Sequence, residues 1–450
     1  MKSDSNMLAD AGRLRWYILI LLTLVMTCSF VDRYALVVLI QPIRAEFHLT
    51  DTQIGLLTGF AFSAAYATMV LPIALYADKT RNRKNIICVA LAAWSVLTAI
   101  CGACQSYWQL LVVRFFFGGA EAGNAPPAHS LLTEIFPLSA RSTALGTFSA
   151  GAPGGLLLAY ALCAPIEALV GWRWALVIIG LVPGLILIVL VALTLKEPSV
   201  KQGAAAHRAH GAMSKGSLKD LLTNPTMIFF LIAAIGVTFL AFGQTLWIPI
   251  FIERSFHIPR SQLGLALALT QAFAMVVGMV AGGPIADWLF KHKGVSSPRY
   301  VAWCIAAATV PLAGMYLSPA VNEVYICSAC AAFPLGMSGG PVGSICQAIA
   351  HPSQRATAAA LNALSLSIVG IGVTPFIVGA LSDALAPKFH DDSLRWALLG
   401  IVAIVVPMTL FSLSRVQRVW SATLMKGAEQ AATAGAASLL GDGTPASAKQ

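Results

Sequence analysis

Charged side chains are scarce in this sequence. Asp, Glu, Lys and Arg make up 11% of its 450 residues, whereas hydrophobic residues make up 58%. A soluble globule of this length needs more polar surface than that composition provides. The sequence therefore excludes a soluble protein and predicts one that is embedded in a lipid bilayer.

Signatures of catalysis are also missing. The sequence contains no convincing Ser/His/Asp triad, no cluster of metal ligands and no phosphate-binding loop. Its nine cysteines include two i,i+3 pairs, Cys101/Cys104 and Cys327/Cys330, but no His or acidic residue stands near either pair. Cysteine in a membrane helix usually serves as a small apolar packing residue. We therefore expect neither an enzyme nor a protein that binds a cofactor or a metal.

Long apolar segments recur along the chain. Each is near or above the ~20 residues that a helix needs to cross hydrocarbon. They predict an all-α integral membrane protein with twelve transmembrane helices, at residues 16–40, 51–77, 85–106, 108–136, 142–166, 173–195, 226–250, 261–287, 299–318, 323–349, 356–382 and 394–414.

The chain also contains an internal repeat. Its anchors are Phe47–Leu56 with Phe256–Leu265, Arg141–Ala144 with Arg355–Ala358, and Arg173–Leu176 with Arg395–Leu398. The same order in both halves indicates two homologous membrane halves, which usually form a binding site between them. We therefore predict two pseudo-symmetric bundles of six helices each.

Polar segments divide the chain into five parts. One such segment, rich in Gly, Ala, Ser, His and Lys, separates the halves, and Ala, Gly, Ser and Thr dominate the last residues in a pattern typical of disorder. The predicted parts are a cytoplasmic N-terminus at 1–15, the N-terminal bundle at 16–195, a cytoplasmic linker at 196–224, the C-terminal bundle at 225–414 and a cytoplasmic, largely disordered tail at 415–450.

Positive charge indicates the orientation in the membrane. When the spans are counted from a cytoplasmic N-terminus, most of the 29 Lys and Arg fall on the inner side. The positive-inside rule then places both termini in the cytoplasm, as in a multi-pass protein of the cell (inner) membrane. The net charge of +10 follows from this topology and requires no nucleic acid. The outer side holds only Arg44, Arg173, Arg254, Arg260, Lys388 and Arg395.

Four ionisable residues stand out because they lie deep within predicted spans. Asp32 and Arg33 belong to the first span, and Arg114 and Glu121 to the fourth. Each costs several kcal/mol in lipid unless it faces a cavity or a partner, so residues of this kind are functional candidates. The two spans run in opposite directions and their charges lie at overlapping depths, so contact between them is possible.

These charges could couple proton movement to transport. Arg114 and Glu121 lie two turns apart on one helix face, and Arg114 could exchange partners between Glu121, Asp32 and a substrate anion. With Asp32 ionised and Glu121 protonated, the group carries one net positive charge, which suits an anionic headgroup. A static ion-pair network is the alternative, although buried ion pairs stabilise only weakly. The second half has Ala241 and Cys330 at the equivalent places, so the fold alone does not require these charges.

Other candidate substrate contacts are mostly neutral. The amides among them serve more often in hydrogen bonds between helices than as ligands. They fit either an amphiphile with an anionic head or a small carboxylate such as a sugar acid. These candidates, beside Arg114, are Tyr34, Tyr66, Gln244, Trp247, Gln271 and Asn362.

A further group of charges lies at the predicted inner surface. Asp78 follows the second span and precedes a basic run, and Asp287 stands at the repeat-equivalent place. An acid facing basic loops there would form a charge latch that breaks when the halves rock. Alternatively, the basic run only fixes topology. The candidate cytoplasmic gate comprises Asp78, Arg83, Lys84, Glu134, Arg141 and Asp287.

One motif resembles a known family. Gly283-Pro284-Ile285-Ala286-Asp287 with nearby basic residues resembles the signature of the major facilitator superfamily, although the copy after the second span has Ala74 in the Gly place. The related anion:cation symporters share the Asp-Arg pair and the Arg/Glu spacing. Within the superfamily the chain is similar to the spinster-like group, on Val31–Tyr34, Asn82–Lys84, Arg114 with Glu121–Gly123, Ile135–Pro137 with Arg141, Gly171–Ala175 and Leu381–Pro387.

The resemblance implies a twelve-helix carrier with the major facilitator fold, alternating access and a site at mid-membrane. It also implies proton coupling through Asp32, Arg33, Arg114 and Glu121. Animal spinster proteins move lysolipids and sphingolipids, so we expect a small-molecule or lipid-like substrate, with protons and membrane lipids as further partners and a monomeric chain. Two alternatives remain, an uncoupled facilitator and a proton symporter for sugar acids or carboxylates of the anion:cation type.

Overall fold

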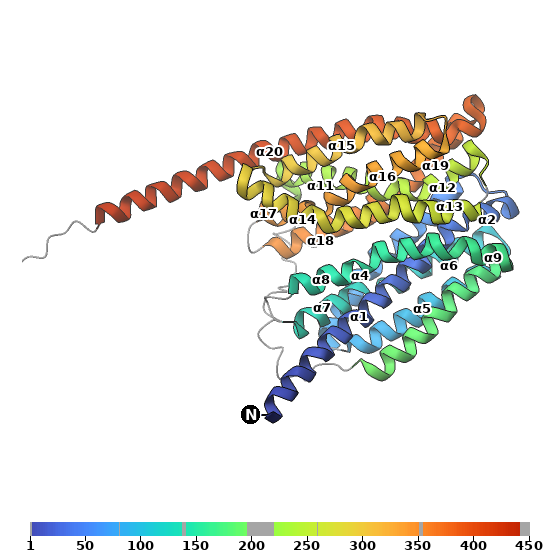
Figure 1. The fold of residues 1–450 in the computed structure, drawn as a ribbon, viewed down its shortest axis with the longest axis horizontal. Coiled ribbons are helices and arrows are strands. Elements are labelled where there is room, and N and C mark those ends of the chain that lie inside the picture. Colours follow the sequence, from blue (N-terminus) through green and yellow to red (C-terminus); the bar gives the residue numbers. More distant parts are fainter. Residues whose placement is uncertain are drawn as a thin grey trace, which may run out of the picture.

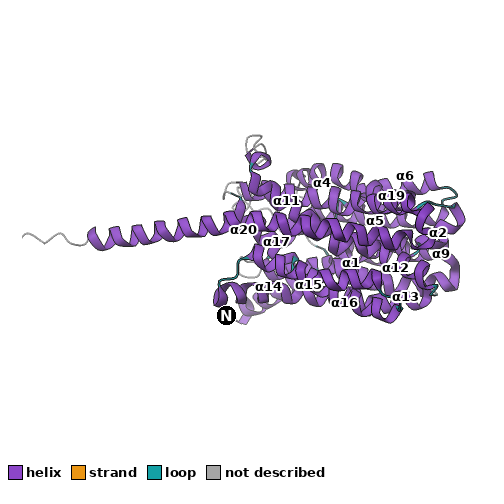
Figure 2. Cartoon of the chain, turned by 90° about the horizontal axis from the view of Figure 1, so that it is seen from above, coloured by secondary structure: helices purple, strands orange, loops and turns teal. Residues whose placement is uncertain are grey.

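The computed structural model describes residues 2–80, 82–136, 141–195, 220–258, 260–350 and 354–441. Within these ranges all regular structure is helical (Figure 2). The helices of the first half of the chain, blue to green in Figure 1, lie beside those of the second half, yellow to red.

The first half begins with a long helix that packs against α9. Its helices are α1 (Lys2–Val38), α2 (Ile40–Phe47), α3 (Asp51–Gly55), η1 (Leu56–Phe60), α4 (Ala61–Thr80), α5 (Arg83–Ala103), α6 (Tyr107–Glu121), α7 (Ala125–Ile135), α8 (Arg141–Ser149) and α9 (Gly151–Thr194).

The second half repeats this arrangement. Its helices are α11 (Pro225–Thr238), η5 (Phe239–Gly243), α12 (Gln244–Phe256), α13 (Arg260–Leu267), η6 (Ala268–Ala272), α14 (Phe273–Lys293), α15 (Ser297–Leu317), α16 (Val321–Met337), α17 (Gly339–Ile349), α18 (Arg355–Ser365), η8 (Leu366–Val373), α19 (Thr374–Phe389), η9 (His390–Asp392) and α20 (Ser393–Gly441).

The apolar helices confirm the predicted membrane fold. Among the described residues, seven stretches are long and apolar enough to span a bilayer, and a bent pair from Pro225 to Phe256 makes up to eight. Two of the seven, with 51 and 60 residues, are long enough for two crossings each. One of them is divided at Gly171, whose φ of 78° is non-helical. Together with the broken spans α6/α7 and α16/α17, these helices are consistent with twelve crossings.

Four described spans contain a π-helical turn, namely η1, η5, η6 and η8. Such turns insert an extra residue into the helix and often occur at functional sites. A Cβ on Gly59 of η1 would meet the backbone of Gly372 in η8 at 2.6 Å. The π turns therefore lie partly at the contact between the two halves.

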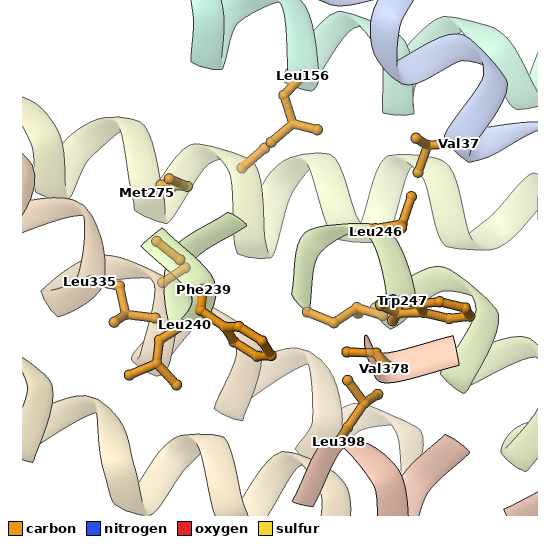
Figure 3. Packing of buried hydrophobic residues seen from close by; sticks show 14 of the residues in the cluster. Val37, Leu156, Phe239, Leu240, Leu246, Trp247, Met275, Leu335, Val378 and Leu398 are labelled. Atoms are coloured by element: carbon orange, nitrogen blue, oxygen red, sulfur yellow. The ribbon is translucent and has the colours of Figure 1, made fainter. Parts of the chain in front are cut away.

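Apolar side chains fill the space between the halves. Val37 and Leu156 come from the first half, and Leu246, Trp247 and Met275 come from the second (Figure 3). Because lipid tails are as apolar as these side chains, van der Waals packing rather than removal from water stabilises such contacts within the membrane. The outer surface of the molecule is apolar as well, which fits a protein surrounded by lipid.

Glycines bring the two halves closest together at one end of the molecule. A Cβ on Gly55 would overlap the backbone of Pro375, one on Gly379 would overlap Asp51, and one on Gly264 would overlap Tyr160. We call the end of the bundle that contains α2, α3 and η9 the Asp51 end; it lies opposite the N-terminus (Figure 1). The halves are therefore closed against each other toward the Asp51 end.

The two polar segments predicted from the sequence are the linker between the halves and the C-terminal tail. Residues 196–219 of the predicted linker lie outside the described residues. Instead of the largely disordered tail expected from 415, α20 continues as a helix to Gly441 and runs beyond the bundle (Figures 1 and 2). The prediction of disorder rested on the Ala, Gly, Ser and Thr content, but an Ala-rich sequence also has high helix propensity. Residues 442–450 lie outside the described part of the chain.

The glycine contact leads to a stability prediction. In Gly55→Ala, the added methyl group would overlap the backbone of Pro375, and overpacking of this kind costs about 1–3 kcal/mol. We expect a lower midpoint of thermal unfolding in detergent. Gly400→Ala is the matched control, because nothing lies within 4 Å of a Cβ at Gly400. Equal midpoints for the two variants would contradict the packing argument.

Candidate functional site

Glu121 is the centre of a buried polar group between α1 and α6. The Ser29 hydroxyl donates a hydrogen bond to Glu121 Oε1 at 2.7 Å, and Arg33 Nε donates to Glu121 Oε2 at 3.2 Å. Arg33 Nη2 also forms an ion pair with Glu121 Oε1. Ser29 and Arg33 lie one turn apart on α1, so one face of this helix supplies every one of these donors.

The local sequence explains where Glu121 stands. It is the last residue of α6, and the chain turns through 122–124 before α7 begins. Gly118 packs directly against the backbone of Phe62, which brings α4 close to α6. The break between α6 and α7 therefore leaves Glu121 at a helix end, 3% exposed, in the middle of the predicted fourth span.

Aromatic rings surround the Arg33 guanidinium. Its Cζ lies 4.4 Å from the ring centroid of Phe30 and 4.2 Å from that of Phe62. Cation–π contacts of this kind favour a positive charge where water is excluded. The candidate residues Tyr34 and Tyr66 pack against these same two rings, at centroid distances of 6.1 and 5.7 Å. The structure therefore places both tyrosines beside the Arg33–Glu121 pair.

Arg114 and Asp32 are each 1% exposed, but their side chains make fewer hydrogen bonds than that of Glu121 does. Arg114 Nη2 donates to the carbonyl oxygen of Arg33 at 3.4 Å, and its Cζ lies 4.5 Å from the Phe117 ring. The Cys28 thiol donates to Asp32 Oδ2 at 3.8 Å. Arg114 Nε and Asp32 Oδ1 have no hydrogen-bond partner among the described residues. The four predicted charges thus lie together, but Glu121 pairs with Arg33 rather than with Arg114.

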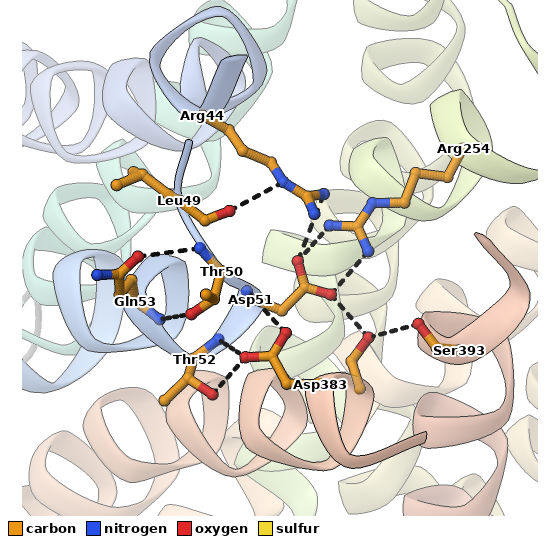
Figure 4. A network of polar contacts seen from close by, with 10 residues as sticks. Arg44, Leu49, Thr50, Asp51, Thr52, Gln53, Arg254, Asp383 and Ser393 are labelled. Carbon is orange, nitrogen blue, oxygen red and sulfur yellow. Dashed lines mark hydrogen bonds and ion pairs between the residues drawn. The ribbon is translucent and has the colours of Figure 1, made fainter. Parts of the chain in front are cut away.

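A second polar cluster joins the two halves at the Asp51 end (Figure 4). Arg254 of α12 binds both carboxylate oxygens of Asp51, and Ser382 of α19 donates to Asp51 Oδ2 at 2.7 Å. In return, Asp383 accepts hydrogen bonds from the backbone amides of Asp51 and Thr52 at 3.1 and 2.8 Å. Arg254 of the second half therefore neutralises Asp51 of the first half. Asp383 of the second half in turn caps the N-terminus of α3 in the first half.

The surroundings of this cluster are also polar. Arg44 Nη1 lies 3.4 Å from Asp51 Oδ1, and Arg44 Nε donates to the carbonyl oxygen of Leu49 at 3.1 Å. An open cavity of about 790 Å³ lies over the cluster, lined by residues that include His48 and His390. None of the four buried charges lines this cavity. The cavity therefore opens onto the cluster and not onto the buried charges.

Sequence analysis did not identify this cluster as a site. Asp51 and Asp383 were seen only as parts of longer motifs, and Arg254 only as a charge on the predicted outer side. The available signal was their position: all three lie near span ends on the same side of the membrane. Which of them meet depends on how the halves pack, which the sequence does not show.

The motif Gly171-Trp172-Arg173-Trp174 has a local role in the first half. Trp172 Nε1 donates to Glu46 Oε2 at 2.9 Å, and Arg173 forms an ion pair with Glu46 Oε1. The hydrogen bond from Arg173 holds the pKa of Glu46 below its ordinary value. These contacts fasten α2 to the second part of α9, beside the break at Gly171.

The candidate gate residues are only partly assembled. Arg83 pairs with Glu134, and both side chains are largely buried. This pair lies within the first half, so it does not itself join the halves. Asp287 is exposed and Lys84 half-buried. The side chains of Asp78 and Arg141 lie outside the described residues.

The candidates from the second half differ in their environments. Trp247 is 0% exposed and packs beside Leu246 and Val378 in the apolar core (Figure 3), rather than lining a described cavity. Gln271 is buried and Asn362 half-buried, and Asn362 Oδ1 has no hydrogen-bond partner in the described part of the chain. The side chain of Gln244 lies outside the described residues.

Comparisons with known proteins agree with this architecture. The family model described as Major Facilitator Superfamily matches residues 22–375. An "MFS-type efflux pump" of Mycolicibacterium smegmatis is 32% identical over 406 residues, which cover 87% of this chain and 90% of that protein. The "Sphingosine-1-phosphate transporter SPNS2" of Mus musculus is 23% identical over 396 residues, which cover 83% of this chain and 70% of that protein.

A solved structure has the same fold. It is described as a bacterial homolog to the human lysosomal transporter Spinster, in an inward-facing and unoccupied conformation. It superposes with a TM-score of 0.78 at 24% sequence identity, covering 90% of this chain and 98% of that one.

The Asp51 cluster leads to a second stability prediction. Arg254→Gln leaves the buried Asp51 carboxylate without its main cationic partner, a loss that costs about 3–5 kcal/mol for buried pairs. We expect a clear fall in the midpoint of thermal unfolding. Lys388→Gln removes one positive charge from an exposed position of α19 and should leave the midpoint nearly unchanged. An Arg254→Gln protein as stable as this control would show that the cluster does not hold the halves together.

Proposed function

Because this chain belongs to the major facilitator superfamily, whose members are transporters and not enzymes, we propose that it is a proton-coupled secondary carrier. Its substrate is a small organic anion or an amphiphile such as a lysolipid. It moves this substrate across the cell (inner) membrane by alternating access, as a monomer with both termini in the cytoplasm.

One observation carries the proposal: two acids and two arginines are buried together between α1 and α6. Asp32, Arg114 and Glu121 are each 3% exposed or less. Charges at this depth are costly unless they serve a site or a partner. The Arg33–Glu121 pair is satisfied, whereas Arg114 and Asp32 each retain an unbonded atom among the described residues. A group in this state can accept a proton or an anion without first breaking a strong ion pair.

The closure at the Asp51 end supports alternating access. With cytoplasmic termini, the Asp51 end faces outward, so the described conformation is closed to the outside. The Asp51 cluster then serves as the outer gate, and its contacts cross from one half to the other. For the opposite conformation, we propose that Asp78, Arg83, Lys84, Glu134, Arg141 and Asp287 form the cytoplasmic gate.

The charge and polarity of the interior support an anionic substrate. Arg114 offers a guanidinium whose contacts are a carbonyl oxygen and an aromatic ring. Tyr34 and Tyr66 lie beside the Arg33–Glu121 pair. From the second half, the candidate contacts remain Gln244, Trp247, Gln271 and Asn362. A mostly neutral second half suits the apolar part of an amphiphile. The mouse relative is named as a sphingosine-1-phosphate transporter, which also favours this substrate class.

Ligand binding provides the first test. We expect a lysophospholipid with an anionic head to raise the thermal unfolding midpoint of the purified protein more than a sugar acid or a monocarboxylate does. Hydrogen bonds to charged groups contribute about 1.5–3 kcal/mol, so Arg114→Gln should weaken binding about tenfold or more.

Arg299→Gln is the control for this test, because Arg299 is exposed and its guanidinium lies over the Trp303 ring. Stabilisation that is equal in Arg114→Gln and Arg299→Gln would count against an anion site at Arg114. A stronger response to sugar acids than to lysophospholipids would favour the alternative carboxylate symporter.

Flux in proteoliposomes tests the coupling to protons. With the stabilising ligand as substrate, a pH gradient should accelerate uptake by the unmodified protein. In Asp32→Asn and in Glu121→Gln, the increase in uptake rate caused by the gradient should be smaller by about tenfold or more, because each variant lacks a carboxyl group that can hold a proton. Asp220→Asn, at an exposed position, should behave like the unmodified protein. Flux that ignores the gradient in the unmodified protein would identify an uncoupled facilitator.

A further inference from the structure

A cavity apart from the buried charges lies where three helices begin or end. We call it the α11/α20 cavity; its volume is about 280 Å³, and it is lined by Asn224 and Thr226 of α11, Ile349 of α17, and Val416 and Trp420 of α20. These residues stand at the ends of the predicted seventh, tenth and twelfth spans, on the side opposite the Asp51 end (Figure 1). Span ends lie at the level of the lipid headgroups. The cavity is therefore at a membrane interface rather than at the buried charges.

The walls of the α11/α20 cavity are mainly apolar. Val416 is 0% exposed and belongs to the hydrophobic core, against which Ile349 and Trp420 also pack. Val419, another lining residue, is 45% exposed, so the cavity reaches the surface of the bundle. Because the cavity is too small for a whole phospholipid, an occupant of that kind must continue along the neighbouring surface.

An apolar surface leads from the cavity toward the middle of the membrane. Phe411 of α20 is 53% exposed, and its ring lies edge to face with that of Phe229 of α11, with 6.2 Å between the centroids. Both rings lie one to two helical turns deeper than the cavity residues of the same helices. This surface suits an acyl chain that lies along α11 and α20.

Positive charge stands beside the cavity. Arg415 and Arg418 of α20 are exposed, and Arg415 lies one turn before Val419. The Arg415 guanidinium lies over the Phe411 ring, 4.9 Å from its centroid. Neither arginine forms an ion pair with another of the described residues. Cations directly after a membrane span favour anionic lipid headgroups.

Trp420 adds a hydrogen-bond donor to the apolar wall. Its Nε1 is buried and has no hydrogen-bond partner in the described part of the chain. Tryptophan at a membrane interface commonly packs its ring among apolar groups and directs its N–H to a polar acceptor. The ester carbonyl of a bound lipid supplies such an acceptor at this depth.

We propose that the α11/α20 cavity binds one anionic phospholipid of the surrounding bilayer. Its phosphate contacts Arg415 and Arg418, and its ester region fills the cavity beside Trp420. One acyl chain continues over Phe229 and Phe411. A protein partner fits less well, because the apolar surface runs into the depth of the hydrocarbon. The lipid is a bound partner and not the cargo, so this inference does not depend on the proposed substrate or on proton coupling.

Native mass spectrometry of the purified, full-length protein tests the proposal. We expect dioleoyl phosphatidylglycerol, which is anionic, to bind more tightly than dioleoyl phosphatidylcholine, which has the same chains and no net charge. Each cation beside an anionic headgroup contributes about fivefold in affinity. Arg415→Gln combined with Arg418→Gln should therefore weaken the binding of phosphatidylglycerol by about tenfold or more.

Lys79→Gln combined with Lys291→Gln is the matched control. It also removes two exposed cations from the same side of the bundle, but from α4 and α14 instead of α20. If the positive residues only set the topology, the two double variants should lose affinity equally. An equal loss, or equal binding of the two lipids by the unmodified protein, would overturn the proposal.

Ala348→Leu tests the cavity and keeps both arginines. Ala348 is an exposed lining residue, so a larger side chain there should occupy part of the cavity without disturbing the fold. We expect phosphatidylglycerol to bind several-fold more weakly to Ala348→Leu than to Ala348→Ser, which adds little volume. Glycerol 3-phosphate, which has a phosphate but no acyl chain, should not displace the lipid. Equal affinity in the two variants, or displacement by glycerol 3-phosphate, would show that no lipid chain occupies the cavity.

These binding measurements and the flux assay fail independently. If phosphatidylglycerol binds as expected but flux ignores the pH gradient, the lipid site stands and the proposed coupling is wrong. If flux depends on the gradient but the arginine variant binds phosphatidylglycerol like its control, the coupling stands and the lipid site is wrong.

Discussion

The ion pair between Arg33 and Glu121 is the contact on which the interior of this protein depends. A charge inside the membrane is tolerated only where the protein supplies a partner, and this pair supplies one across two helices. Ser29 completes the shell of the carboxylate, and Phe30 and Phe62 cover the guanidinium. This pair is satisfied on both sides, whereas Asp32 Oδ1 and Arg114 Nε have no hydrogen-bond partner among the described residues.

The contact between the halves follows a related rule at the Asp51 end. Glycines such as Gly55 and Gly379 let backbones touch, and the acids Asp51 and Asp383 are each satisfied by groups from the opposite half. Backbone contact and charge compensation therefore occur at the same place in the contact between the halves, and the cluster there borders an open cavity.

The two halves share a fold but not a chemistry. The first half carries the buried charges, whereas the second has Ala241 and Cys330 at the equivalent places and presents neutral or apolar groups such as Gln271 and Trp247. The internal repeat thus accounts for the shared fold of the two halves. The different residues at equivalent places account for the presence of buried charges in the first half.

The sequence by itself determined the membrane class and the paired bundles, because hydropathy and repeated motifs depend on segments that are local in the chain. It also found the four buried charges, since any ionisable residue in an apolar span is conspicuous. Only the tertiary structure decided that Glu121 pairs with Arg33 rather than Arg114, that Trp247 packs into the core, and that Asp51 meets Arg254 and Asp383. Those outcomes depend on helix rotation and on the approach of distant segments, and neither is encoded in the spacing of residues along one helix.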